Sequence, residues 1–594
     1  MPKNPQSLHA LAAATQQAAV HYSIDASDVL AHLYRVTLTV AKPAKNQRVR
    51  LPVWIPGSYM VREFSKHLQN LRAAQGGASI GLQQLDKCSW KVLSTAMQPL
   101  VLHYEVYALD NSVRTAWLNS QRGFFNGTSL CLQVAGQEDL SHSLDLIAIN
   151  SIAGCAVSTG ATALKIDKNG FGNYQFANYD ALADCPFELG KFWRGSFTVR
   201  GVQHDFVVAG AAPSFDGKRL LADTQQIVAT QMQFWHGDED KPPWGKYVFM
   251  LNAVDDGYGG LEHRNSTALI CNRRDLPRVG ISKASDGYIT LMGLISHEYF
   301  HTWNVKRLRP ADFTRYDYNS EQYTQLLWFF EGFTSYYDDL LLRRAGLIDN
   351  AGYLKLLNKT INQVMQTPGA RVQSVAQSSF DAWVKYYRQD ENTPNATVSY
   401  YTKGALVALC FDLTLRTEKC SNLDAVMREL WVRCKAGPLL EKDFAAVLRQ
   451  LGGRSFAPEI KAWVQGTNDL PLKALLEQQG VKVIEDKAQL AQRLGLRVVE
   501  AHGALQVKAV LRGGPAEAAG MAAGDEWLAV GDWRLRKLDD LPIFTGRSRR
   551  VKALVSRDQR LLRLDLALPA QEDSVTWMLR AGDVACLDAW LGDA

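Results

Sequence analysis

The stretch "ISHEYFHTWN", residues 295–304, places two histidines four positions apart, with a glutamate directly after the first. Residues at this spacing lie on one face of an α-helix, about 40° apart around its axis. The imidazoles of His297 and His301 can therefore converge on one metal ion, which predicts a zinc-binding helix. Glu298 points too far around that helix to join them easily, and its position suits a general base that acts on a water beside the metal.

A catalytic zinc site needs a third protein ligand and keeps one coordination position open. The segment "LWFFEGFTSYYDD", residues 327–339, carries Glu331 inside an otherwise apolar helical run, where an unpaired carboxylate would be costly to bury. We predict that Glu331 is this ligand and that the chain binds one Zn²⁺. Asp338, seven residues later, either accepts the free N–H of a ligating histidine or is a solvated acid at the helix end.

Length and composition limit the class of protein. A chain of 594 residues is too long for one hydrophobic core and predicts several domains. Its 47% hydrophobic and 21% charged residues are typical of a soluble globular protein. The net charge of +6 is too small for its length to indicate nucleic acid or an anionic membrane as a partner. No apolar run approaches the roughly 18 residues that membrane insertion requires.

The cysteines and the first residues bear on the compartment. Nine cysteines are scattered through the sequence without a CxxC pair, which favours reduced thiols over a disulfide framework. The opening "MPKNPQSLHALAAATQQAAV" lacks a basic segment followed by a solid apolar core, so we expect no signal peptide. These features predict a cytoplasmic protein, with the periplasm as the alternative.

Hydrophobic periodicity divides the chain into a multidomain α+β protein. After a flexible leader, residues 1–20, the strand-like alternation of "LYRVTLTV" (33–40) and "LHYEVYAL" (102–109) predicts a β-rich domain over 21–204, where no catalytic constellation is visible. Helical spacing dominates 205–480. One helix there should begin at Ser285 or Asp286 and carry the two histidines. A second should begin at Asn319 or Ser320, carry Glu331 and end near Gly346.

The C-terminal part changes pattern again. "LQVKAVLRGGPAEAAGMAAGDEWLAVGDWRL", residues 505–535, predicts a strand, a Gly-Gly-Pro turn, a short helix from Pro515 to Gly520 and a second strand. This order resembles a PDZ domain, which we place at 481–570, followed by a tail at 571–594. Arg493 and Gly495 would then lie at the loop that takes a peptide's terminal carboxylate. The domain either binds a C-terminal peptide in its groove or packs on the catalytic body.

Several motifs together resemble known metallopeptidases. His297, Glu298 and His301, followed by Glu331 in "FEGFTSYY", look like the gluzincin peptidases, which implies a thermolysin-like, mainly helical catalytic domain. "GYGGLEHRNS" (257–266) and "YYTKGALVAL" (400–409) are similar to the G-x-M-E-N and Y-x-K-G segments of zinc aminopeptidases. With "WIPGSYMVREF" (54–64) and the PDZ pattern, the chain resembles the glycyl aminopeptidase family over about residues 21–570.

This resemblance implies roles for further residues. Glu262 would anchor the α-ammonium group of a free peptide N-terminus, and Gly259 and Gly260 would let the backbone run close beside the substrate. Tyr401, which matches the tyrosine of Y-x-K-G, would donate its phenol to the oxyanion of the reaction, with its neighbour Tyr400 as the fallback. The family resemblance also implies a preference for glycine or alanine at the N-terminus.

One departure from the broader aminopeptidase pattern affects the approach to Glu331. The gap between His301 and Glu331 is longer than in those enzymes, so "NVKRLRPADFTRYDYNS" (304–320) must loop out before Glu331 reaches the metal. Two other functions stay open. One is a metalloendopeptidase that holds substrates in a PDZ groove. The other is a catalytically silent peptide-binding scaffold, although the intact set of candidate catalytic residues speaks against it.

Overall fold

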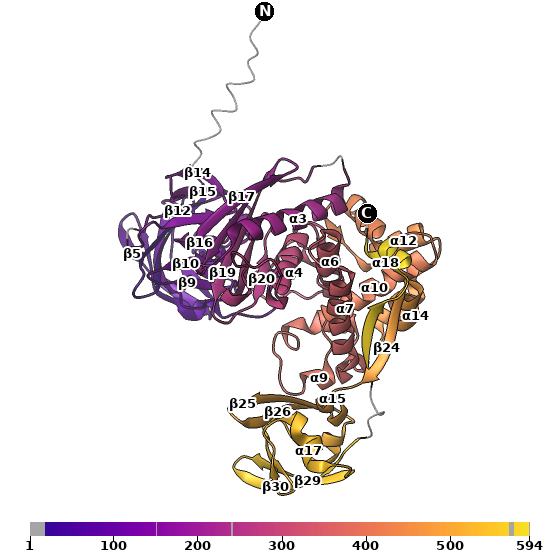
Figure 1. Ribbon diagram of the computed structural model, residues 1–594. Coiled ribbons are helices and arrows are strands. Elements are labelled where there is room, and N and C mark those ends of the chain that lie inside the picture. The colour runs from indigo at the N-terminus through magenta and orange to yellow at the C-terminus, as the bar shows by residue number, and fades with distance from the viewer. Residues whose placement is uncertain (1–17, 150, 239–240, 570–574, 593–594) are drawn as a thin grey trace, which may run out of the picture. The chain divides into compact units, whose positions relative to one another are not determined.

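The structure of the protein is a computed structural model that describes residues 18–149, 151–238, 241–569 and 575–592 (Figure 1). Most of the predicted leader, residues 1–17, lies outside the described residues. The chain divides into two compact units. The first contains residues 1–225, 241–302 and 315–322, and the second contains residues 226–240, 303–314 and 323–594.

The first unit opens with an eight-stranded sheet in the order β14-β15-β12-β1-β2-β8-β4-β5. Its strands are β1 (Val20–Asp28), β2 (Leu33–Val40), β4 (Leu68–Gln75), β5 (Ala78–Ile80), β8 (Leu100–Tyr107), β12 (His142–Leu146), β14 (Thr162–Ile166) and β15 (Gly172–Phe176). The predicted alternation along β2 is confirmed, because Tyr34, Val36, Leu38 and Val40 are all buried. Successive residues of a strand point to opposite faces, so this burial marks the face that builds the core.

Two four-stranded sheets complete the β-rich part, in the orders β13-β16-β10-β9 and β11-β3-β7-β6. Their strands are β3 (Arg48–Arg50), β6 (Leu82–Asp86), β7 (Ser89–Val92), β9 (Ala116–Leu118), β10 (Arg122–Phe125), β11 (Gln133–Val134), β13 (Ala156–Thr159) and β16 (Phe187–Gly190), with the short helices α1 (Gly127–Leu130) and α2 (Tyr179–Ala183). The N-terminal part is therefore β-rich, as the sequence predicts.

A five-stranded sheet in the order β17-β18-β19-β21-β20 follows. Its strands are β17 (Trp193–Val199), β18 (Val202–Ala209), β19 (Lys246–Val254), β20 (Gly259–Glu262) and β21 (Ser266–Asn272). The predicted boundary between residues 204 and 205 falls inside β18, because β17 and β18 pair with each other and with β19. Among the described strands, β20 pairs only with β21, so its other side is a free edge of the sheet.

Helices α3 (Gly217–His236) and α4 (Asp286–Phe300) follow β18 and β21 along the chain. The start predicted for the histidine-bearing helix is confirmed, since the Ser285 side chain accepts a hydrogen bond from the backbone N–H of Tyr288 at 3.1 Å. Such a cap satisfies one of the amide groups that a helix N-terminus leaves without an intrahelical partner. Most of α4 is buried, which fits a helix that supports a site from inside the fold.

The second unit contains the helical part of the chain. Its helices are α5 (Leu327–Phe330), α6 (Gly332–Arg344), α7 (Asn350–Met365), α8 (Val375–Phe380), α9 (Thr393–Ala396), α10 (Thr402–Thr417), α11 (Leu423–Arg433), α12 (Glu441–Gly452), α13 (Ala457–Glu459) and α14 (Leu472–Gln478). The short strands β22 (Arg309–Pro310) and β23 (Pro438–Leu439) pair with each other.

The predicted start of the second helix, at Asn319 or Ser320, is wrong, because helical structure begins at Leu327. Both residues instead form hydrogen bonds with Asp317. Its carboxylate accepts a hydrogen bond from the backbone N–H of Asn319 at 2.9 Å and one from the hydroxyl of Ser320 at 2.6 Å. Hydrogen bonds from short polar side chains to nearby backbone groups compete with the backbone hydrogen bonds of a helix. The helical run is also divided, because Glu331 separates α5 from α6.

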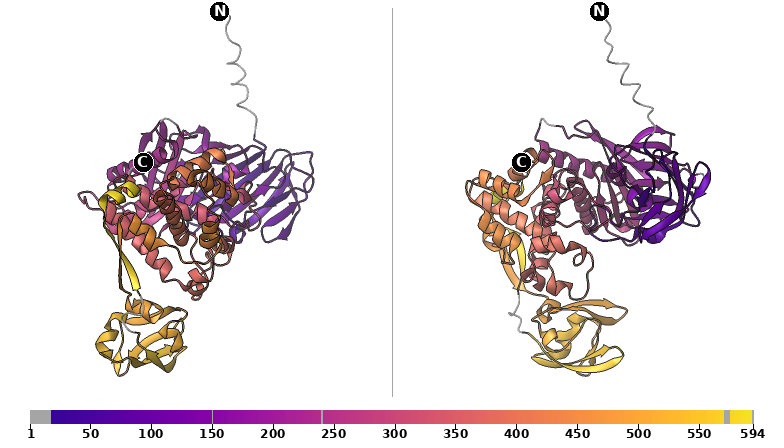
Figure 2. Two further views of the ribbon diagram at one scale, coloured as in Figure 1. Left: turned by 90° about the vertical axis from the view of Figure 1, so that its right-hand side faces the viewer. Right: turned by 180° about the vertical axis from the view of Figure 1, so that it is seen from behind.

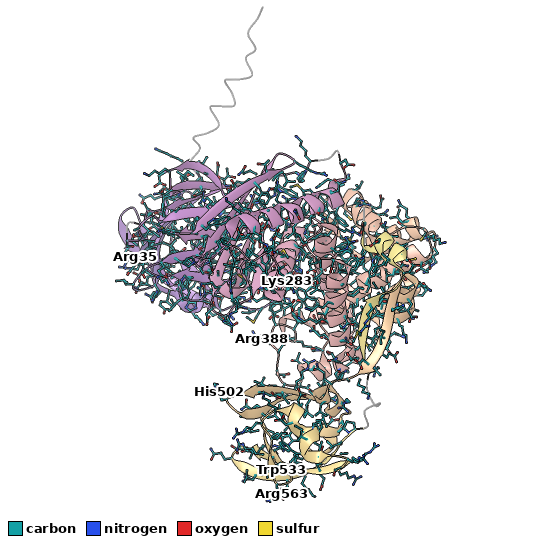
Figure 3. All side chains as sticks on the ribbon, in the orientation of Figure 1. Arg35, Lys283, Arg388, His502, Trp533 and Arg563 are labelled. Atoms are coloured by element: carbon teal, nitrogen blue, oxygen red, sulfur yellow. The ribbon has the colours of Figure 1, made fainter. Side chains whose placement is uncertain are left out.

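A separate sheet of β25 (Leu496–Ala501), β26 (Ala504–Val510), β27 (Glu526–Val530), β28 (Trp533–Arg534), β29 (Arg550–Arg557) and β30 (Arg560–Ala567) follows, with the helices α15 (Leu490–Leu494), α16 (Pro515–Ala518) and α17 (Leu541–Thr545). The predicted short helix from Pro515 is present, and the sheet has a hydrophobic core of its own. Trp533 and Arg563 are exposed on this sheet (Figure 3). The PDZ assignment stays a prediction.

Residues on either side of that sheet are joined by the antiparallel pair β24 (Val481–Lys487) and β31 (Val575–Ala581), drawn side by side in Figure 2. Helix α18 (Val584–Leu591) follows β31. The predicted tail, residues 571–594, thus contains a strand and a helix in its described part.

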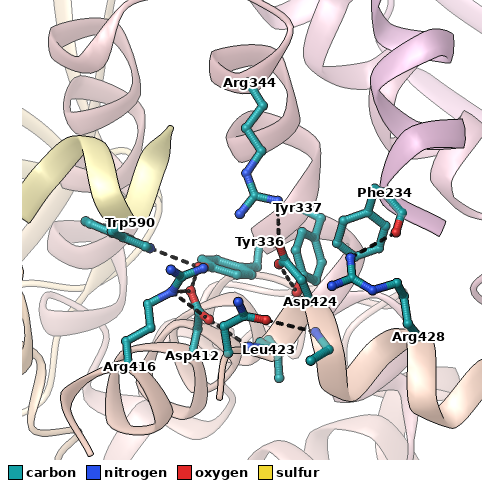
Figure 4. A network of polar contacts seen from close by, with 12 residues as sticks. Phe234, Tyr336, Tyr337, Arg344, Asp412, Arg416, Leu423, Asp424, Arg428 and Trp590 are labelled. Carbon is teal, nitrogen blue, oxygen red and sulfur yellow. Dashed lines mark hydrogen bonds and ion pairs between the residues drawn. The ribbon is translucent and has the colours of Figure 1, made fainter. Parts of the chain in front are cut away.

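A buried polar network holds α6 against α10 and α18 (Figure 4). The Tyr336 hydroxyl donates to the Asp412 carboxylate at 2.7 Å and accepts the indole N–H of Trp590 at 3.3 Å. Arg416 pairs with Asp412 at 3.0 Å and donates to the Ala589 carbonyl at 3.2 Å. The Asp412 side chain is fully buried, so losing one of these partners would leave an uncompensated buried charge.

A second pair of contacts in the same network joins α6 to α11. Arg344 forms an ion pair with Asp424 at 2.7 Å, and both side chains are almost fully buried. The Tyr337 hydroxyl donates to the same carboxylate at 3.0 Å. Burial would raise the pKa of Asp424, but the Arg344 guanidinium and the hydrogen bonds outweigh it and hold that pKa below its usual range. Asp424 therefore stays ionised, and α6, which begins directly after Glu331, is fixed along its length.

Among the described residues, no helix combines the length and the apolar character needed to cross a bilayer. None of the nine cysteines, all of which lie in the described part of the chain, is in a disulfide bond.

Candidate active site

Three side chains form a group that could hold a metal ion. The Nε2 atoms of His297 and His301 lie 3.0 Å apart, with their rings nearly perpendicular at 85°. One ligand atom from each histidine and from Glu331 lies within 4.8 Å of the other two. Two nitrogens that bind one zinc ion at tetrahedral angles are about 3.3 Å apart. Two imidazoles and a carboxylate at these separations fit the donor set that zinc takes in catalytic sites.

The position of Glu331 is fixed by its backbone. Its N–H donates to the Leu327 carbonyl at 2.7 Å, although the residue falls at the break between α5 and α6. The preceding carbonyl, of Phe330, accepts hydrogen bonds from Asn304 at 3.1 Å and Thr334 at 2.6 Å. Glu331 is only 2% exposed, so it is buried, as its place in an apolar run predicts.

Glycines bring α10 close to the residue after Glu331. A Cβ atom on Gly332 would lie 2.6 Å from the Cα of Gly404, and one on Gly404 would lie 2.9 Å from the Cα of Gly332. The backbones of α6 and α10 therefore touch where neither residue has a side chain. Tyr401 caps the start of α10, three residues before Gly404. Burial, followed by the negative charge of Glu331, raises the pKa of Tyr401 well above its ordinary value, so its hydroxyl stays a proton donor.

Tyr401 belongs to a cluster of three tyrosines. Its ring centroid lies 4.7 Å from that of Tyr400 and 5.4 Å from that of Tyr386. The fallback residue, Tyr400, is fully buried and packs against Tyr386 at 4.7 Å. Burial and, more weakly, the Glu331 charge also raise the pKa of Tyr386. Sequence reasoning missed Tyr386, because no motif or spacing connects it with residues 400 and 401.

Glu298, the predicted general base, packs against β20. A Cβ atom on Gly260 would lie 2.0 Å from Oε1 of Glu298 and 2.3 Å from its Cδ. The carboxylate thus occupies the space that any side chain at position 260 would need. Glu298 is 5% exposed, so this contact lies in a largely closed region. Gly260 is therefore required by the fold beside Glu298, and its neighbour Gly259 adopts a φ of +152°.

Glu262 lies two residues further along β20 and is 5% exposed. A Cβ atom on Gly57 would lie 2.5 Å from Oε2 of Glu262, and Gly57 has a φ of +90°. Gly57 stands in the "WIPGSYM" turn of the N-terminal β-rich part. This part therefore contributes directly to the surroundings of a predicted substrate-binding residue. The sequence gave no signal of this contact.

The remaining predicted residues have simpler surroundings. Asp338 is partly buried, and its carboxylate accepts the backbone N–H of Asp339 at 2.6 Å. Gly495 ends α15 with a φ of +70°, and its carbonyl accepts the N–H of Leu511 at 2.8 Å. The roles of Asp338, Arg493 and Gly495 stay predictions.

Comparisons with known proteins agree on the class of protein to which the chain is similar. A family model described as M61 glycyl aminopeptidase matches residues 290–407, and one described as the peptidase M61 N-terminal domain matches residues 21–191. No curated protein sequence matches the chain.

This chain is also similar to proteins of solved structure. An aminopeptidase N family protein from Idiomarina loihiensis is 36% identical in sequence, and the match covers 96% of this chain and 100% of that protein's chain. The two structures superpose with a TM-score of 0.91. Two structures of an M1 zinc metallopeptidase from Deinococcus radiodurans, one with a Tyr-Ser-Ala substrate bound, are 14% identical over 76% of this chain and 94% of theirs. Their TM-scores are 0.46 and 0.45.

The fold and the group of metal-ligating side chains, taken with these matches, define a metallo-aminopeptidase, a hydrolase that acts on peptide bonds. The first family model contains every candidate metal ligand within its matched residues, together with Glu298 and Tyr401. The chain belongs to the M61 glycyl aminopeptidase family.

Proposed function

We propose that this chain is a zinc-dependent aminopeptidase that releases small N-terminal residues, with glycine or alanine preferred, from peptides. The observation that carries this proposal is the convergence of His297, His301 and Glu331, whose ligand atoms lie within 4.8 Å of one another. The preference for small residues rests on the family to which the chain belongs.

His297, His301 and Glu331 would hold one Zn²⁺ ion. When bound, zinc acts as a Lewis acid that lowers the pKa of water and polarises a carbonyl group. The three ligands leave one coordination position for these tasks. Because His301 and Glu331 are buried, bulk water is kept from competing with these two side chains for the metal ion.

Glu298 and Tyr401 perform the proton chemistry. Glu298 takes a proton from the attacking water and returns it to the leaving amine, and its contact with Gly260 limits where its carboxylate can lie. The Tyr401 hydroxyl donates a hydrogen bond to the oxyanion of the tetrahedral intermediate. A donor placed in this way is worth about 3 kcal/mol of barrier, or roughly a hundredfold in rate.

Glu262 restricts cleavage to the first peptide bond of a substrate, which is what makes the enzyme an aminopeptidase. Its carboxylate accepts a charge-assisted hydrogen bond from the free α-ammonium group of the substrate. Glu262 and Gly260 lie two residues apart on β20 and share one face of that strand, about 6.6 Å from each other. Glu298 stands beside Gly260, so a peptide bound at Glu262 has its first peptide bond near the general base.

The deciding experiment compares alanine p-nitroanilide with its N-acetylated form, with and without a chelator. We expect hydrolysis of the free amine only, its loss on chelation and its recovery with added Zn²⁺. Glu262→Gln should raise KM for the free amine without changing the zinc content. Equal hydrolysis of the acetylated compound would replace this proposal with a metalloendopeptidase. Stoichiometric zinc with no hydrolysis of either would indicate the silent scaffold.

Gly260→Ala tests the packing of Glu298. The new methyl group would occupy the position of the Glu298 carboxylate, so we expect kcat to fall about a hundredfold as the base is displaced. The zinc content should stay unchanged, because Gly260 is not one of the three candidate ligands and the atoms nearest to a Cβ atom at this position belong to Glu298. Gly245→Ala is the matched control, since a Cβ atom there meets nothing within 4 Å. A kcat for Gly260→Ala equal to that of the control would show that Glu298 is not held by this contact.

We also propose that the sheet from β25 to β30 is a PDZ module. The succession of β26, α16 and β27, and the separate hydrophobic core, support this assignment. Arg493 and Gly495 would then take part in binding the terminal carboxylate of a peptide.

A further inference from the structure

An arginine of the N-terminal β-rich part reaches the free edge of β20. Arg114 lies in the segment between β8 and β9, and its Nη2 donates to the Gly260 carbonyl at 3.0 Å. Its Nη1 lies 3.6 Å from the place that a Cβ atom on Gly259 would take. The guanidinium therefore lies along β20 from Gly260 towards Gly259, away from Glu262.

Among the residues that the structure describes, Arg114 has no acidic partner for its charge. Its Nε atom is buried without a hydrogen-bond partner, and Arg114 forms no ion pair within the described part of the chain. Arg122, eight residues later, shows the usual arrangement, because two of its nitrogens each donate to Glu188 at 2.7 Å. A partly buried guanidinium without a carboxylate is costly unless a ligand supplies one.

The order of groups along β20 indicates which ligand this is. In the proposed function, on which this inference rests, Glu262 binds the substrate's ammonium group and Glu298 acts beside Gly260. The part of the substrate beyond the first peptide bond then extends towards Gly259 and Arg114. In a dipeptide, that part ends in a carboxylate within one residue, about 3.3 Å of chain.

We propose that Arg114 binds the α-carboxylate of dipeptide substrates, on the side of the leaving amine. Its remaining N–H groups form a planar fork that suits a carboxylate, and the Gly260 carbonyl fixes the orientation of that fork. Arg114 is thus a specificity-determining residue that favours dipeptides over substrates without a carboxylate at this place.

The test uses the zinc-loaded full chain and three substrates, Ala-Ala, Ala-Ala-amide and alanine p-nitroanilide. Arg114→Gln should lower the ratio of kcat/KM for Ala-Ala to that for Ala-Ala-amide about 30-fold, mainly through KM, as expected for one charge-assisted hydrogen bond. Arg274→Gln is the matched control, because Arg274 is an exposed arginine that pairs with the exposed Asp255. This control should leave the ratio unchanged.

Two results would overturn the inference. One is an unchanged ratio, and the other is an equal loss on all three substrates, which would mean that Arg114 acts only by holding Gly260. Calorimetric binding of Ala-Ala and Ala-Ala-amide to the Glu298→Gln variant, with and without Arg114→Gln, gives the same comparison without turnover. The inference can thus fail while alanine p-nitroanilide is still hydrolysed. If no substrate is hydrolysed, the proposed function fails and calorimetry still decides the role of Arg114.

Discussion

Glu331→Gln is expected to lower the zinc affinity of the protein more than about a hundredfold and to abolish hydrolysis of alanine p-nitroanilide. The reason is the lost charge, because the imidazoles of His297 and His301 then lack the anionic third ligand. Elemental analysis after dialysis measures the effect directly. Glu391→Gln, a change at an exposed glutamate of the same unit, should retain full zinc.

Glutamine keeps the size and shape of glutamate, so this variant removes the anionic ligand with little change in the packing around position 331, which is 2% exposed. Normal zinc content in Glu331→Gln would remove this residue from the ligand set.

Glu298→Gln is expected to lower kcat by at least about a thousandfold while the zinc content stays the same. Glutamine has the shape of glutamate, so the packing against Gly260 is retained and only the ability to accept a proton is lost. Single-turnover assays with alanine p-nitroanilide, normalised to bound zinc, separate this loss from a loss of metal. A kcat within tenfold of the unaltered enzyme would assign the general base to another group.

Comparing these two variants separates metal binding by Glu331 from proton transfer by Glu298. His297, Glu298 and His301 occupy one helical turn, so their relative positions follow from helix geometry once α4 is known to form. Glu331 was identified by a different argument, the cost of an isolated carboxylate among apolar residues. The structure brings its side chain to the two imidazoles.

Hydrophobic periodicity did not predict where the helical run around Glu331 begins or where it is divided. The hydrogen bonds of Asp317 to Asn319 and Ser320 are local, and they compete with helix formation before Leu327. Glu331 then separates α5 from α6. Periodicity reports which residues are apolar and does not report such side-chain hydrogen bonds.

Two residues beside β20 were missed for a different reason. Gly57 and Arg114 are more than a hundred positions away from Gly260 in the sequence, and no local pattern shows which sheet edge they will meet. The β-rich part was therefore read as free of candidate site residues. Only the tertiary fold shows that it lines β20.

The pairing of β24 with β31 has a consequence for how this chain tolerates change. β24 ends at Lys487 and β31 begins at Val575, and these two residues are partners in one antiparallel ladder. Everything between them is an excursion whose two ends meet at the same place. We therefore expect that this segment can be shortened, lengthened or exchanged while Trp590 still reaches Tyr336, so that the helix that follows Glu331 is not disturbed.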